Sequence, residues 1–266
     1  LTRKRAAADA NTIVLVGTAQ GEKTMHLPEV VVFKGSISGE PNSVVTLCAV
    51  NNELIGSIRR ADGSSYSIAP DNTTDGALHC IVPDQSMHQQ NELLHCMSEE
   101  GQRMMKNKLQ APAGMSAVSK SERPLSTKLL EVRVAVECDT KFFTELVKDT
   151  VKSAGYALAL ISMASIAFED DLNVMLSVPW LKIWTDAPSD PYSVNGDAYA
   201  LAWKAQTYWK ANNADVDRDV VHVLTAGGGG GLGLLYPLGN GGGGTTVCSK
   251  NDGFSSSGPF TFHKYP

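Results

Sequence analysis

The chain has 266 residues, a formal net charge of −5 and 42% hydrophobic residues. This length suits one or two domains, and the hydrophobic content is sufficient for a packed core. The acidic balance, with basic residues clustered only at Arg3-Lys4-Arg5, argues against a nucleic-acid partner. No apolar run reaches the ~18–20 residues that span a bilayer, so we expect no transmembrane segment.

Residues 1–96 predict an antiparallel β unit. Runs of apolar and β-branched residues, such as Val30–Phe33 and Ser43–Val50, are separated by residues that favour turns. Asp62-Gly63 is a strong two-residue hairpin signal between two of these runs. Short strands at such close spacing favour an antiparallel sandwich or a curled sheet.

Residues 97–128 differ in composition, because Met, Lys, Gln, Ser and Ala dominate and large apolar residues are sparse. We expect a linker with at most one short helix. Arg103, Lys106 and Lys108 suit this segment to proteolytic cleavage. An ordinary solvated surface segment is an equally good interpretation of the same composition.

Residues 129–266 have the pattern of an α/β domain. Leu130–Val136 alternates as a strand does, and Asp139 is a suitable N-cap for a long helix that ends at Glu169-Asp170-Asp171. A strand over 172–184, bent at Pro179 or divided there, comes next. A second helix is expected over 197–211, followed by a Val-rich strand over 219–225. On that second helix one face would carry Tyr199, Trp203, Gln206 and Trp209.

Glycines are concentrated between Gly227 and Gly258, which invites comparison with a phosphate-binding loop. The sequence has no G-x-x-x-x-G-K-[ST] motif, and no helix signal follows the glycines. The better interpretation is a set of tight turns around one short apolar strand, Leu232–Leu235.

No catalytic or metal-binding residue is assigned from the motifs. No two histidines have the spacing of a helical zinc site. His222, flanked by Val220 and Leu224, is better explained as a core or hydrogen-bonded residue than as a ligand. Glu169-Asp170-Asp171 makes calcium binding possible, although a solvated turn is favoured.

Two features concern processing in the secretory pathway. Asn72-Thr73-Thr74 is a sequon, so Asn72 is a candidate for glycosylation. If the protein is secreted, Cys80 and Cys96 are candidates for a disulfide that closes a local loop. The alternative is that these cysteines are buried free thiols.

Five blocks in order give residues 132 to about 250 a resemblance to a known family. These blocks are Arg133–Asp139, Ser165–Val174, Leu181–Trp184 with Asp190-Pro191-Tyr192, Tyr208-Trp209 with Arg218–Thr225, and Gly231–Leu235 with Cys248. Together they resemble the first part of a metzincin zinc endopeptidase domain of the adamalysin/reprolysin type. Residues 30–68 more weakly resemble the β-rich pro-domain of such zymogens.

This resemblance implies a fold and a function. The expected fold is an N-terminal antiparallel β pro-domain-like unit followed by a partial zincin-like α/β/α half-domain with a mixed twisted sheet. The implied function is that of a secreted or cell-surface zymogen-type metalloendopeptidase, which hydrolyses peptide bonds by a metal-activated water. Its implied substrate-binding edge strand comprises Leu232, Gly233, Leu234 and Leu235, which would pair with an extended polypeptide substrate.

The sequence departs from that family in one respect. The family motif H-E-x-x-H-x-x-G-x-x-H, which supplies zinc ligands and general base, is absent from the chain. Zinc is therefore implied by the resemblance without ligands here, and we expect the missing C-terminal half or another protein partner to cover the open side of the sheet. The alternative is a catalytically inactive, protease-derived structural or cell-surface assembly protein.

Overall fold

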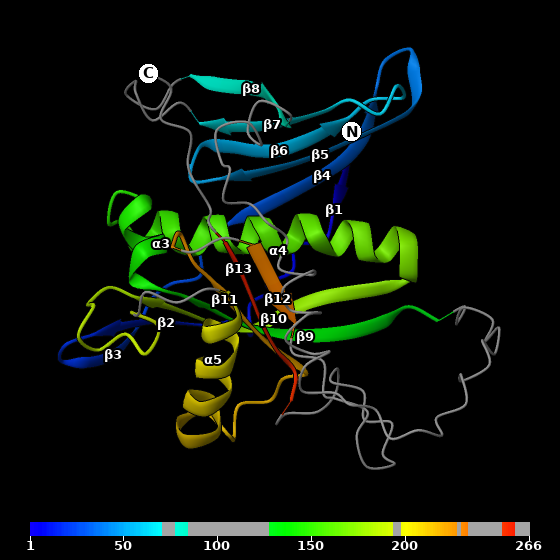
Figure 1. The fold of residues 1–266 in the computed structure, drawn as a ribbon. Coiled ribbons are helices and arrows are strands. Elements are labelled where there is room, and N and C mark those ends of the chain that lie inside the picture. Colours follow the sequence, from blue (N-terminus) through cyan, green and yellow to red (C-terminus); the bar gives the residue numbers. More distant parts are fainter. Residues whose placement is uncertain (71–77, 85–127, 194–197, 228–229, 234–251, 259–266) are drawn as a thin grey trace, which may run out of the picture.

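The computed structural model describes residues 1–70, 78–84, 128–193, 198–227, 230–233 and 252–258. In this part of the chain the strands form two sheets, and the long helix α4 (Thr150–Leu172) lies between them (Figure 1). The fold is therefore mixed α and β, which confirms the predicted fold class at that level.

The smaller sheet is antiparallel throughout. Its strand order is β1-β4-β5-β6-β7-β8. A hairpin at Asp62-Gly63 connects β6 to β7, where Gly63 has a φ of +86°. Its turn is longer than the predicted two residues, because residues 60–64 separate the strands. The six strands are β1 (Thr2–Lys4), β4 (Val30–Ile37), β5 (Glu40–Val50), β6 (Glu53–Arg59), β7 (Ser65–Pro70) and β8 (His79–Pro83).

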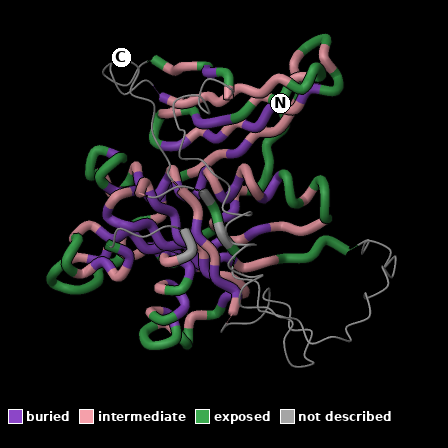
Figure 2. The backbone as a smooth tube through the Cα atoms, viewed as in Figure 1, coloured by how far each residue is buried: buried purple, intermediate pink, exposed green. Residues whose placement is uncertain are grey.

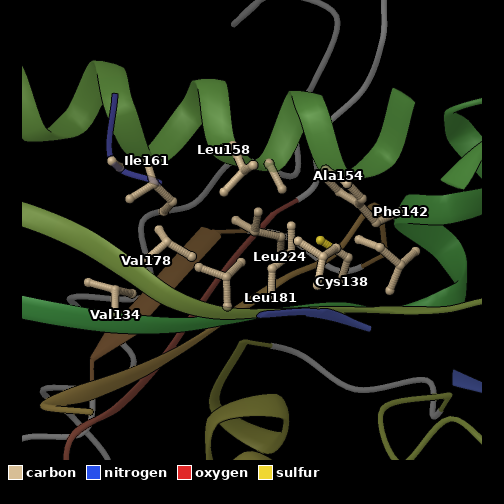
Figure 3. Packing of buried hydrophobic residues seen from close by; sticks show 14 of the residues in the cluster. Val134, Cys138, Phe142, Ala154, Leu158, Ile161, Val178, Leu181 and Leu224 are labelled. Carbon is tan, nitrogen blue, oxygen red and sulfur yellow. The ribbon is translucent and has the colours of Figure 1, made fainter. Parts of the chain in front are cut away.

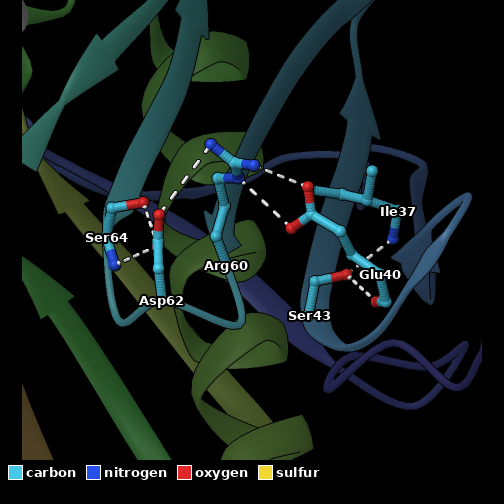
Figure 4. Close-up of polar contacts among 6 residues, drawn as sticks. All are labelled: Ile37, Glu40, Ser43, Arg60, Asp62 and Ser64. Atoms are coloured by element: carbon cyan, nitrogen blue, oxygen red, sulfur yellow. Dashed lines mark hydrogen bonds and ion pairs between the residues drawn. The ribbon is translucent and has the colours of Figure 1, made fainter.

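A polar cluster fixes the turns at one end of this sheet (Figure 4). Arg60 donates from Nε and Nη2 to the two carboxylate oxygens of Glu40, at 3.2 and 2.6 Å. The Ser43 hydroxyl accepts from the Ile37 backbone N–H at 2.8 Å and donates to the Glu40 carbonyl at 2.6 Å. Because of the Arg60 hydrogen bonds, the pKa of Glu40 lies below its ordinary value. The β4–β5 turn is thereby held against the end of β6.

The larger sheet has seven strands in the order β12-β13-β11-β9-β10-β2-β3. The five central strands are parallel, and the two edge strands, β12 and β3, run antiparallel to their neighbours. The strands are β2 (Ile13–Thr18), β3 (Gly21–Thr24), β9 (Leu130–Cys138), β10 (Val174–Trp184), β11 (Val220–Leu224), β12 (Gly230–Gly233) and β13 (Phe254–Gly258).

The N-terminal segment contributes to both sheets. The β2–β3 hairpin joins the larger sheet, where β2 pairs with β10 from Trp180↔Ile13 to Trp184↔Gly17. The sequence pattern did not indicate this pairing, because it connects segments that lie far apart in the chain. The division into 1–96, 97–128 and 129–266 stays a prediction, and residues 85–127 lie outside the described ranges.

The single long helix predicted from Asp139 is wrong, because the structure has two helices there. Asp139 caps α3 (Thr140–Glu145), and its carboxylate accepts from the Phe142 N–H at 2.7 Å. Val147 and Lys148 then adopt positive φ values of 52° and 58°, which ends the helical path. Asp149 starts α4 with a second cap, accepting from the N–H groups of Val151 and Lys152.

The other helix and the bent strand agree better with expectation. β10 is one continuous strand through Pro179, with a register shift against β9 between Ser177 and Trp180. α5 (Ala198–Asn212) begins and ends within one residue of the predicted bounds. The predicted inner face of α5 needs one correction: Gln206 and Trp209 are buried, whereas Trp203 is 44% exposed.

Helix α4 packs on both sheets. Figure 2 shows the helix between them, and Figure 3 shows the side chains that it packs against the larger sheet. Leu158 and Ile161 contact the larger sheet, and Ala159 and Ile166 contact the smaller one. A Cβ on Gly155 would lie 2.4 Å from Val50 Cγ2, so helix and sheet approach closely there. By length and composition α4 could cross a membrane, but 56% of its apolar stretch is buried inside this fold, as expected of a core helix.

Helix α5 covers the opposite face of the larger sheet. Leu201, Ala205 and Trp209 pack with side chains of β9, β10, β11 and β13. The Trp180 and Trp209 rings meet edge to face, with centroids 4.8 Å apart. With α4 on one face and α5 on the other, the central strands are covered on both sides, which fits the largely apolar sequences of β2, β10 and β11.

Candidate functional site

The strand predicted to bind substrate lies at the edge of the larger sheet. β12 is antiparallel to β13, with Gly231 opposite Ser257 and Leu232 opposite Ser256. Within the described ranges β12 is the last strand on this side of the sheet. Leu232 and Gly233 belong to β12, whereas Leu234 and Leu235 lie outside the described residues.

A histidine connects the two strands behind this edge. The Nδ1 atom of His222 lies 2.7 Å from the Ser255 hydroxyl, and Nε2 lies 2.8 Å from the Ser257 hydroxyl. Ser255 donates its own proton to the Val221 carbonyl at 3.2 Å, so it accepts from Nδ1–H, and Nε2 accepts from Ser257. Burial lowers the pKa of His222 to about 4. His222 is therefore neutral and joins β11 to β13 by two hydrogen bonds. This agrees with the prediction of a core or hydrogen-bonded residue.

A buried carboxyl group lies under α5, on the other face of the sheet. The Glu137 side chain is fully buried and accepts from Trp184 Nε1 at 3.3 Å, while its second oxygen, Oε1, has no hydrogen-bond partner in the described structure. Burial raises the pKa of Glu137 to about 7, although the nearby Tyr192 hydroxyl, the Lys182 ammonium and the Trp184 N–H favour the ionised form. Glu137 therefore changes its protonation state near neutral pH.

Lys182 carries a buried positive charge near Glu137. Its side chain is fully buried, forms an ion pair with Glu22 of β3, and donates to the Tyr208 hydroxyl at 3.1 Å. The ammonium also lies 3.7 Å from the centre of the Trp184 ring. Glu22 thus connects the N-terminal hairpin to the interior of the larger sheet.

Two more buried carboxylates organise the carboxyl ends of the parallel strands. Asp139 caps α3 and also accepts from the Thr225 hydroxyl beyond β11. Asp190, in the loop after β10, accepts from the Thr140 N–H and hydroxyl, both at 2.8 Å, and from the Tyr192 N–H at 2.7 Å. Burial raises the pKa of Asp139 to about 6 and that of Asp190 above its ordinary value.

The sequence analysis did not predict that Glu137, Lys182 and Asp190 are buried in the interior. A signal was available for the first two, because each interrupts a run of apolar residues in a central strand that is buried on both faces. Asp190 lies in a loop, and nothing in its local sequence indicates that its carboxylate turns inward to Thr140.

The other candidate residues are placed only in part. Cys80 lies in β8 as a free, partly buried thiol, and Cys96 and Asn72 lie outside the described ranges. The disulfide and the glycosylation therefore stay predictions. Of the acidic triplet that ends α4, Asp170 pairs with Lys34, and Glu169 accepts from the Ser165 hydroxyl at 3.2 Å.

The described residues do not fit the zinc that the resemblance implies. No three His, Cys, Asp or Glu side chains among them are arranged to hold a metal ion. Both nitrogens of His222 are occupied by serine hydroxyls, and His263 lies outside the described ranges. We therefore assign no catalytic step to these residues, and calcium binding at Glu169-Asp170-Asp171 stays a prediction.

Comparison with known proteins gives one sequence relative. No protein-family model matches the chain. In an alignment of 176 residues that covers 63% of this chain, it is 25% identical to the disintegrin and metalloproteinase domain-containing protein unc-71 of Caenorhabditis elegans. The aligned part is 16% of that protein, so the chain spans about one sixth of the relative's length.

Among solved structures, the chain is similar to metalloproteinase-II from Bacteroides fragilis. The TM-score is 0.37 at 10% identity, over 92% of this chain and 68% of that one. The sequence match is weak homology, and it supports a relationship between this chain and the metallopeptidases.

Proposed function

We propose that this chain is the upstream part of a zinc-dependent metalloendopeptidase that acts outside the cell or at its surface. In this proposal residues 1–96 are the pro-domain-like unit of a zymogen, residues 97–128 are the linker cleaved on activation, and residues 129–266 begin the catalytic domain. The weak homology to a disintegrin and metalloproteinase domain-containing protein supports the metallopeptidase part of this proposal.

The observation that carries the proposal is the position of β12 at the edge of the larger sheet in the described part of the chain. An antiparallel edge strand, on a sheet whose five central strands are parallel, can add an extended peptide through main-chain hydrogen bonds. The substrate in this proposal is therefore a polypeptide bound as an extra strand beside β12.

The zinc ligands and the general base would have to come from residues beyond those described. In the metzincin pattern an H-E-x-x-H helix supplies them, and the metal supplies a nucleophilic water at neutral pH. The first experiment is to read the transcript downstream of residue 266. An H-E-x-x-H motif there supports the proposal. A stop codon or a continuation without the motif contradicts it and leaves the inactive structural protein.

A second experiment tests the role of β12 directly. Peptide substrates of the full-length protein are N-methylated at one amide at a time, which removes one main-chain donor from each. Because successive N–H groups of a strand point to opposite sides, we expect KM to rise for alternate amides only. Equal effects at every amide, or at none, would contradict binding by strand addition.

A further inference from the structure

The described residues before position 85 pack against those after position 127 over two surfaces. One surface is the edge of β10, where the β2–β3 hairpin joins the larger sheet. The other is the side of α4 that faces the smaller sheet (Figure 1). Each surface therefore joins segments that lie on opposite sides of the linker predicted at residues 97–128.

Backbone hydrogen bonds attach the N-terminal segment to the larger sheet beyond the five β2–β10 pairs. The Val178 N–H donates to the Ala7 carbonyl at 2.8 Å, and the Ala7 N–H donates to the Ser162 hydroxyl at 2.9 Å. Thr185 donates from its N–H and its hydroxyl to the Gly17 carbonyl, at 3.0 and 2.9 Å. The segment is thus hydrogen-bonded to the larger sheet and to α4 along its whole length from Ala7 to Gly17.

The hairpin also completes the hydrophobic core. Val14 of β2 is 1% exposed and belongs to the same cluster as Leu158 of α4 and Leu181 of β10. The Gly17 backbone lies directly against Trp184, because a Cβ on Gly17 would be 2.5 Å from Cε3 of that ring. Departure of the hairpin would return this apolar surface to water, which is unfavourable.

A buried charge crosses the same surface. Lys182 is fully buried, and Glu22, its ion-pair partner, belongs to β3 of the hairpin. Removing one partner of an ion pair whose other charge stays buried is destabilising. Departure of the hairpin would therefore cost an ion pair as well as apolar packing.

The smaller sheet forms the second surface. Val50 and Ile55 of this sheet belong to one hydrophobic cluster with Ala159 of α4. Glu53 and Lys152 form an ion pair across the same surface, with the ammonium 2.7 Å from the carboxylate oxygen. This side of α4 is therefore covered by residues from before the predicted linker.

We propose that the chain, once cut within residues 97–128, remains a complex of its two pieces, with β2 and β3 retained in the larger sheet. The partner that fits the β10 edge and this side of α4 is thus the N-terminal piece of the same chain. The proposal concerns only how the pieces bind, so it does not depend on peptidase activity. In a peptidase, it would make the N-terminal piece a lasting subunit and not a segment that leaves on activation.

The test uses the 266-residue chain with a recognition sequence for a site-specific protease introduced within residues 97–128. After complete cleavage, confirmed by mass spectrometry, we expect the two pieces to elute together from a size-exclusion column in native buffer, at the volume of the uncut chain. Because unfolding of the cut protein releases two chains, its Tm should rise with protein concentration, whereas the Tm of the uncut chain should stay constant.

Variants locate the binding at β2 and β3. Val14→Ala removes buried methyl groups, and we expect it to raise the Kd between the pieces about 10- to 100-fold in a dilution series. The matched control is Ile13→Ala, at a position of the same strand that is 52% exposed, which should change the Kd by less than about threefold. Glu22→Gln should raise the Kd about tenfold, whereas Glu29→Gln, at an exposed position after the hairpin, should leave it unchanged.

Three outcomes would overturn the proposal. One is that the pieces separate, or that either aggregates, when the chain is cut in native buffer. Another is that the Tm of the cut protein does not depend on concentration. The third is that Val14→Ala and Ile13→Ala change the Kd equally, which would mean that β2 does not stay in the sheet.

Discussion

Replacing Glu137 with glutamine should remove a large part of the pH dependence of stability. The folded-state pKa of Glu137 is about 7, above its ordinary value of 4.5, because the side chain is fully buried. The folded protein therefore binds this proton more tightly than the unfolded chain, and the free energy of unfolding falls as pH rises from about 5 to 8. At about 1.4 kcal/mol per pKa unit, the loss over that range is about 2–3 kcal/mol.

Glutamine keeps the shape of the side chain but does not titrate. We therefore expect Glu137→Gln to gain about 2–3 kcal/mol relative to wild type between pH 5 and pH 8. The assay is urea unfolding followed by tryptophan fluorescence at both pH values. Glu131→Gln, at an exposed position of the same strand, is the matched control and should follow wild type. If Glu137→Gln and wild type lost stability in parallel, the buried carboxyl would not be the source.

Three further substitutions test the packing and the second pH-sensitive group. Leu158→Ala should lower the free energy of unfolding by about 2–5 kcal/mol because the side chain is fully buried, whereas Leu172→Ala, at a half-exposed position, should change it by less than about 0.5 kcal/mol in the same denaturation assay. Gly155→Ala should destabilise by about 1–3 kcal/mol despite the higher helix propensity of alanine, because the new Cβ meets Val50; a more stable variant would contradict the close approach. The folded-state pKa of His222, about 4, lies below the ordinary 6.5, so wild type should lose stability as pH falls from 6.5 to 4, and His222→Gln should flatten this loss in an acid titration.

Much of the local structure could be predicted because it depends on short-range signals. Alternating apolar residues identified β9, and Asp62-Gly63 identified a hairpin. The break between α3 and α4 was missed although Asp149 is itself a good N-cap, because the helical spacing of apolar residues continues across the break. A second capping residue within a long periodic segment was the available signal.

The remaining features depend on contacts between distant segments. The pairing of β2 with β10 and the ion pair between Glu22 and Lys182 join residues about 160 positions apart, so no local pattern indicates them. The sequence alone does not determine on which face of the sheet α4 or α5 packs, because both helices carry apolar residues that could pack on either face.

The edge strand was predicted from a resemblance and from the glycines around it. The structure places Gly230–Gly233 at the edge of the larger sheet, two residues before the predicted Leu232–Leu235, of which Leu234 and Leu235 lie outside the described residues. Its role in substrate binding stays a proposal, since it depends on a bound peptide and on a metal centre outside the described residues.

Hydrolysis by the full-length protein tests the central claim most directly. The protein is cleaved within residues 97–128, its bound zinc is quantified, and turnover of an unstructured polypeptide is measured with and without a chelator. We predict about one zinc ion per chain and peptide-bond hydrolysis that the chelator abolishes and added zinc restores. A folded, cleaved protein that holds zinc without hydrolysing any polypeptide, or that holds none, would contradict the assignment as a metalloendopeptidase.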